Sequence, residues 1–197
     1  MKRVPQSIGD NRAMQTAHFF DEVEDMIVNR LHREADSPEG RAELVRSTGI
    51  VDQQLIDEFA QLGVTADGVI AIRLFPLVMV AWAEDSSDLK ERTAVMGEAL
   101  RLGIIEDSTA WILLDTWLKE RPRGINLDAW KRYTKVMFRS MSAVARKRLI
   151  EFTEKEMTAI AKSSGGLLGI GTVSRREREM IHKLVLMMNK LSDAISE

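Results

Sequence analysis

Carboxylates that could hold a cation gather in one short stretch, at residues 84–91. The acidic residues of this stretch are Glu84, Asp85, Asp88 and Glu91. Grouped carboxylate oxygens are the ligands that hard divalent cations prefer, so a divalent cation is the cofactor that the stretch suggests. Its spacing differs from that of a calcium loop, because Lys90 stands at the sixth position counted from Asp85, where that loop needs glycine.

The same carboxylates have two other interpretations. Asp88 and Glu91 stand three residues apart, which is the spacing of a capping box at the start of a helix. Acidic side chains are also favoured at the positive end of a helix dipole. The cluster could instead contact a protein partner. Capping, cation binding and partner binding all stay open at this point.

Basic residues repeat at four-residue spacing later in the chain, at Lys131, Lys135 and Arg139. On a helix they would form one stripe, which could follow a phosphate backbone or meet an acidic partner. Bases exceed acids by about seven over residues 119–162, and acids exceed bases by about seven over residues 15–60, so head-to-tail self-association is a further option. The alternative is that these charges only keep one face of each helix solvated and bind no partner. The net charge of −2 argues against nucleic acid as the partner.

Arg73 is the one charge inside an otherwise apolar stretch at residues 69–83. A guanidinium in a protein core must be paired with a carboxylate. We expect a structural ion pair, with Asp115 as the partner. The alternative is that Arg73 lines a small pocket for an anion.

Several familiar chemistries are missing from the sequence. The chain has no cysteine, and its three histidines, His18, His32 and His182, are isolated. Nothing matches a nucleophile elbow or a dinucleotide fingerprint. The glycine-rich residues 165–171 lack the lysine of a phosphate loop, so we expect a connector there, followed by a capping box of Ser174 and Glu177. We therefore expect no enzyme, although an unrecognised active site stays as a third class.

Periodicity predicts the elements that position these residues. Apolar residues recur at helical spacing throughout, which predicts an all-α fold: a single compact domain of about eight helices over residues 1–197, with residues 1–10 flexible. The central helix, near residues 66–83, is apolar on every side and so should be buried. It is shorter than the ~20 residues of a membrane span, and Pro76 should bend it.

Other expectations concern the tryptophans and the outer helices. We expect structural roles for Trp82, Trp111, Trp117 and Trp130. A helix capped by Asn126 should carry Trp130 and continue, with a bend, past Leu149. The basic N-terminus has no apolar run behind it, so we expect no signal peptide and a cytoplasmic protein.

Residues 77–92 resemble the signature of the TerB-like helical family, named for tellurite-resistance proteins. They read Leu-Val-Met-Val-Ala-Trp-Ala-Glu-Asp-Ser-Ser-Asp-Leu-Lys-Glu-Arg. The family signature is an apolar helix ending in Ala-Trp-Ala-Asp-Gly, then a cap, then Glu-Arg. Here Glu84 takes the place of the Asp, Asp85 takes the place of the Gly, and Glu91-Arg92 match.

Later segments, at residues 114–122, 129–133 and 164–174, also look like parts of uncharacterised bacterial relatives in this group. The resemblance implies an all-helical fold, a bacterial cytoplasmic setting, a link to stress response and a divalent metal at Glu84 and Glu91. Together with the residues, it predicts a non-enzymatic binding or scaffold protein. The alternative is a protein that binds nucleic acid or an acidic partner through the basic stripe.

Overall fold

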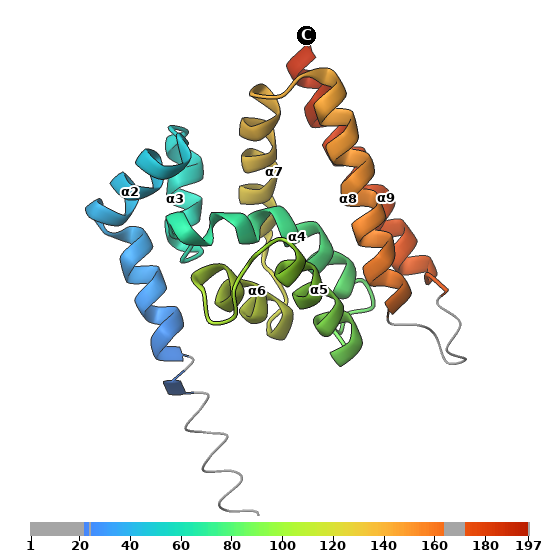
Figure 1. The fold of residues 1–197 in the computed structure, drawn as a ribbon, viewed down its shortest axis with the longest axis horizontal. Helices are drawn as coiled ribbons and strands as arrows, with labels where there is room; N and C mark the ends of the chain where they lie inside the picture. Colours follow the sequence, from blue (N-terminus) through green and yellow to red (C-terminus); the bar gives the residue numbers. More distant parts are fainter. Residues whose placement is uncertain (1–21, 24, 164–171, 197) are drawn as a thin grey trace, which may run out of the picture.

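The described part of the chain is built from helices and contains no strand. In the computed structural model these residues are 22–23, 25–163 and 172–196. The expected flexible segment at residues 1–10 and the glycine-rich residues 165–171 lie outside the described ranges. The predicted all-α, single compact domain is confirmed (Figure 1).

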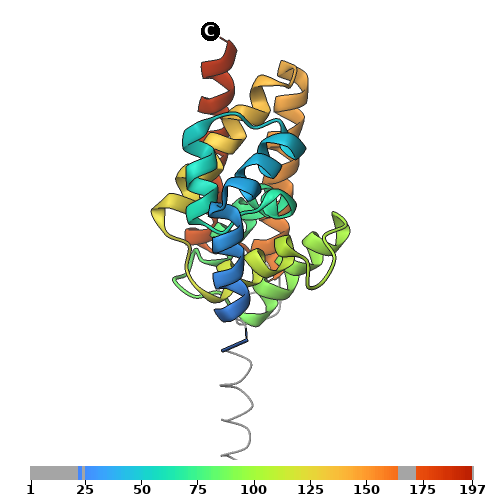
Figure 2. The same ribbon diagram turned by 90° about the vertical axis from the view of Figure 1, so that its left-hand side faces the viewer.

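The N-terminal helices begin and end where the sequence places its capping residues. Residues 25–36 are helical, and α2 (Pro38–Thr48) and α3 (Gln53–Gln61) follow. The hydroxyl of Ser37 accepts a hydrogen bond from the Gly40 amide at 3.0 Å, and Gly49 ends α2 in the left-handed conformation at φ 70°. Figure 2 shows these helices in front of the rest of the molecule, as one layer.

The centre of the molecule is α4 (Val69–Ala81), which follows the short 3-10 helix η1 (Ala66–Gly68). Most of its side chains are fully buried, and every later helix packs against it. The predicted buried central helix is therefore confirmed. Pro76 is buried within α4, and the bend expected there stays a prediction.

The remaining helices surround α4: α5 (Leu89–Arg101), α6 (Thr109–Lys119), α7 (Gly124–Arg139), α8 (Ala143–Ser163) and α9 (Arg175–Ser196). Two expectations are wrong here. The chain breaks at Ser140, so α7 and α8 are separate helices that diverge from a shared turn (Figure 1). Asn126 lies inside α7 rather than at its cap, where its side-chain oxygen accepts a hydrogen bond from the Arg123 amide at 2.9 Å.

Aromatic side chains join α4 to its neighbours. Phe75 contacts Trp117 edge to face and also contacts Trp130, each with ring centroids 6.2 Å apart. Trp82 is half-buried, and its indole N–H donates to the Trp117 carbonyl at 2.9 Å. Trp111 is half-buried and packs against the core. All the tryptophans thus have the structural contacts that we expected.

Within the described residues, no single helix is both long and apolar enough to span a membrane. Only α3 together with residues 66–81 passes that test, as a pair bent by 88°.

Candidate functional site

The four carboxylates predicted as cation ligands lie in and after the turn that leaves α4. Glu84, Asp85 and Asp88 are exposed, whereas Glu91 in the first turn of α5 is buried. Asp85 has a left-handed backbone with φ 66°, a conformation that glycine adopts without strain.

Asp85 is held by arginines from two other parts of the chain. Its carboxylate accepts hydrogen bonds from Arg121 at 2.7 Å and from Arg176, on α9, at 3.1 Å. Arg121 is the main cause of the lowered pKa of the Asp85 carboxyl. Asp85 therefore links the α4–α5 turn to Arg121 and to Arg176 on α9, and both of its carboxylate oxygens are bound by arginines.

The other three predicted ligands line one pocket of about 220 Å³, which we call the acidic pocket. It is lined by Glu84, Ser86, Asp88, Glu91, Thr172, Ser174 and Glu177. Glu177 is a fourth carboxylate, brought from α9 by the packing of the helices. The sequence marked Glu177 only as a capping residue, because nothing local to it reveals that α9 begins beside α5.

Both predicted capping boxes are present, and both face the acidic pocket. Asp88 accepts from the Glu91 amide at 2.8 Å, and Glu91 accepts from the Asp88 amide at 2.9 Å. Ser174 accepts from the Glu177 amide at 3.2 Å, and Glu177 accepts from the Ser174 amide at 2.6 Å. Each of the three carboxylates, those of Asp88, Glu91 and Glu177, therefore uses one oxygen for a helix start.

Negative charge accumulates around Glu91. Only 5% of this residue is exposed, and its pKa is raised to about 7, chiefly by burial and further by the charges of Asp88, Glu177 and Glu84. The hydrogen bond from the Asp88 amide acts in the opposite direction. Three further carboxylates thus lie close enough to Glu91 to raise its pKa.

The carboxylates do not form a ready coordination sphere. In the ranges that the structure describes, no three Asp, Glu or His side chains are arranged to hold a metal ion together. The shared negative charge suits a cation that keeps its own waters, because Mg²⁺ usually retains several waters and uses one or two carboxylates. Six waters at about 30 Å³ each occupy about 180 Å³, which is within the volume of the acidic pocket.

The expected partner of Arg73 is wrong. Asp115 pairs with Lys119 at 2.8 Å, one helical turn away. Arg73 instead lies 3.6 Å from an oxygen of Glu156 on α8, and its guanidinium lies 5.6 Å from the centroid of the Phe152 ring. Sequence could not identify Glu156, because that contact depends on how α8 crosses α4.

The basic stripe lies along α7, but its three members differ. Lys131 pairs with Asp128 at 3.0 Å. Lys135 and Arg139 are exposed, and neither has an acidic partner among the described residues. Trp130 is buried, so it is not a platform for stacking bases. Of the three stripe residues, only Lys135 and Arg139 therefore lack an acidic neighbour among the described residues.

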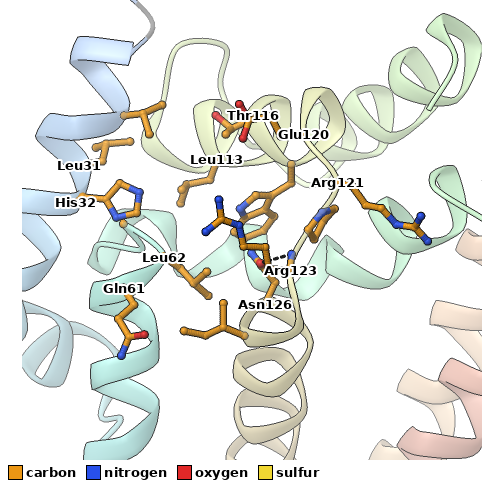
Figure 3. A pocket seen from close by; sticks show the side chains of 15 residues that line it. Leu31, His32, Gln61, Leu62, Leu113, Thr116, Glu120, Arg121, Arg123 and Asn126 are labelled. Carbon is orange, nitrogen blue, oxygen red and sulfur yellow. Dashed lines mark hydrogen bonds between the residues drawn. The ribbon is translucent and has the colours of Figure 1, made fainter. Parts of the chain in front are cut away.

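A separate cleft of about 240 Å³ lies between the helix at residues 25–36, α3, α6 and the start of α7 (Figure 3). His32, Arg121, Arg123 and Asn126 are among its polar residues. Arg121 is engaged by Asp85, and the Thr116 hydroxyl donates to the Ile112 carbonyl at 2.8 Å. Arg121 and the Thr116 hydroxyl therefore already have hydrogen-bond partners within the protein.

Comparisons with known proteins add no relative: no protein-family model, no curated protein and no solved structure matches the chain.

Proposed function

We propose that this chain is a non-enzymatic binding protein that holds a hydrated divalent cation in the acidic pocket. The observation that carries the proposal is the convergence of Glu84, Asp88, Glu91 and Glu177 on one pocket. They come from the α4–α5 turn, α5 and α9, so a cation there would join three parts of the fold. The resemblance of residues 77–92 to the TerB-like signature supports the same site and suggests a bacterial stress-related role in the cytoplasm.

Electrostatics favour a cation over an uncharged ligand. The charges of three neighbouring carboxylates help to raise the pKa of Glu91 to about 7, so these groups repel one another when all are ionised. A divalent cation would relieve that repulsion. Asp88 and Glu91 each have a second oxygen that their capping box does not use, and Glu84 takes part in neither box.

The test is thermal unfolding with increasing Mg²⁺, Ca²⁺ or Mn²⁺. Binding to the folded state alone stabilises it by about 2.7 kcal/mol when the cation concentration is 100 times Kd, so Tm should rise with concentration. Glu84→Gln and Asp88→Asn should each reduce this rise. Asn caps a helix as well as Asp does, so Asp88→Asn removes charge and keeps the cap.

Glu106→Gln is the matched control, because Glu106 is exposed and lies outside the acidic pocket. This variant should keep the full response to the cation. The proposal is wrong if no divalent cation raises the Tm of the wild-type protein. It is also wrong if the Glu84→Gln, Asp88→Asn and Glu106→Gln variants respond alike.

A second candidate function is the binding of an acidic partner by Lys135 and Arg139. Their exposure without acidic neighbours favours it. The partner could be a second copy of this chain, since acids predominate in residues 15–60. Sedimentation at low ionic strength should then show association that weakens as salt is added. Lys135→Glu/Arg139→Glu should abolish it, and retention on DNA at low salt would instead indicate nucleic acid.

A further inference from the structure

A further cavity, of about 160 Å³, is lined by residues of α7 and α8, among others. These two helices diverge from a shared turn (Figure 1). α4 and α9 both pack against α7 and α8 and complete the walls of the cavity. The lining is mostly apolar, with Trp130, Met137 and Phe138 from α7, Met141 from the turn and Met188 from α9. We call it the apolar cavity.

A few polar groups also line the apolar cavity. The polar residues among its lining are Arg73, Thr134, Thr153 and Tyr133. Thr134 is only 6% exposed and Thr153 only 5%. Neither threonine hydroxyl, nor the Tyr133 phenol, forms a hydrogen bond with another described residue. Neither threonine hydroxyl is among the buried atoms that lack a partner, so solvent reaches both, and a molecule that enters the apolar cavity would reach them too.

Arg73 supplies the charge of the apolar cavity. Its side chain is 30% exposed, and its only carboxylate neighbour among the described residues is Glu156, at 3.6 Å. That separation is too long for a good hydrogen bond, and the facing oxygen of Glu156 has no hydrogen-bond partner. A guanidinium carries five N–H donors, so Arg73 keeps donors for an anion.

We propose that the apolar cavity binds a small monocarboxylate with an apolar body, with Arg73 holding the carboxylate. This site is independent of the acidic pocket, which follows the end of α4, whereas Arg73 and Pro76 lie near the middle of that helix. Arginine binds carboxylates in a paired geometry that neutral donors cannot match. The aromatic and methionine side chains would cover the apolar body, and methionines adapt to irregular shapes.

The volume limits the ligand to one ring or a short branched chain. An engineered apolar cavity of about 150 Å³ in another protein binds benzene, so the 160 Å³ present here suits a single aromatic ring. Longer acyl chains would not fit without movement of α7 or α8. The hydroxyls of Thr134 and Thr153 would orient a polar substituent of the ring.

The first test is calorimetric titration with benzoate, and with benzyl alcohol as a neutral analogue of the same shape. Benzoate should bind at one site, more tightly than benzyl alcohol. Arg73→Gln should weaken benzoate binding by about tenfold or more, because a charge-assisted hydrogen bond is lost. Binding of benzyl alcohol to that variant should stay as it is in the wild-type protein. Arg148→Gln, on the exposed face of α8, is the control and should change neither.

The second test needs no substitution, so it does not depend on the folding of any variant. Met137, Met141 and Met188 all line the apolar cavity, and their methyl carbons can be labelled with ¹³C for NMR. Benzoate should shift their signals while leaving that of the exposed Met26 unchanged.

Three results would overturn the proposal. The first is the absence of saturable benzoate binding up to millimolar concentration. The second is binding that Arg73→Gln leaves unchanged. The third is a set of methionine shifts that does not include the three lining residues.

Discussion

At Glu91, burial and a helix cap act on the same carboxylate. Its pKa is raised from 4.5 to about 7, so the folded state binds a proton more tightly than the unfolded chain does. The contribution of Glu91 to stability is therefore intact below about pH 4.5 and is lost as the pH rises through about 7. At about 1.4 kcal/mol per pKa unit, the loss is on the order of 3 kcal/mol.

Glu91→Gln should remove this pH dependence. Glutamine can still accept the hydrogen bond of the capping box, so the variant should match the wild-type protein at low pH and exceed it in stability above pH about 7. Urea unfolding at several pH values, in the presence of a chelator, measures the difference. If the free energy of unfolding varied with pH in the same way in both proteins, the pH dependence could not be assigned to Glu91.

Asp85 offers a test of backbone conformation at the residue scale. Asp85→Gly and Asp85→Ala both lose the contacts with Arg121 and Arg176, but only alanine places a Cβ on a backbone with φ 66°. The alanine variant should therefore be less stable than the glycine variant by about 1 kcal/mol, measured by thermal unfolding. Asp107 also has a positive φ, of 63°. The same pair of variants should differ there in the same direction, although Asp107 has no ion pair among the described residues.

Between elements, the pair of Arg132 and Glu58 joins α7 to α3. The guanidinium donates to both oxygens of Glu58, at 3.1 Å and 3.2 Å, and Glu58 is only 8% exposed. Arg132→Met should lower the free energy of unfolding by about 2–3 kcal/mol, because it leaves a buried carboxylate without its cation. Adding Glu58→Leu should restore most of that loss.

Lys131→Met provides the comparison on the preceding residue of α7. Its pair with Asp128 is at the surface, so the loss should stay below about 1 kcal/mol. Denaturant unfolding of the three variants separates the two cases. Equal losses for Arg132→Met and Lys131→Met would show that burial of Glu58 does not matter.

Local signals were readable from the sequence, whereas contacts between elements were not. The box of Asp88 and Glu91 and that of Ser174 and Glu177 each involve residues three apart, and both were predicted. That the two boxes share one pocket depends on where α9 meets α5, which no local pattern specifies. For the same reason sequence could not find the arginines that hold Asp85, or Glu156 beside Arg73. The break between α7 and α8 was missed because helix formers continue on both sides of Ser140.

At the scale of the whole molecule, α4 is the helix that connects all the later helices to one another. It contacts each of α5 to α9, and most of its side chains are fully buried. Helices that share one buried neighbour lose their packing together, so this part of the fold should unfold cooperatively. Both ligand sites proposed here border this body: the acidic pocket follows the end of α4, and the apolar cavity lies against its middle.

The N-terminal layer has a different relation to that body. α3 packs mainly on α7, and α2 packs on η1 and α3, so this layer has fewer contacts with α4 than the later helices have, although Leu55 and Phe59 belong to the same buried core. Such a unit can open by itself at a lower free energy than global unfolding. Amide hydrogen exchange should therefore be faster in α2 and α3 than in α4, and mass spectrometry of peptides from these helices can follow it. Arg132→Met should speed exchange in α3 before it affects α4, so the N-terminal layer would behave as a detachable flap over a slowly exchanging centre.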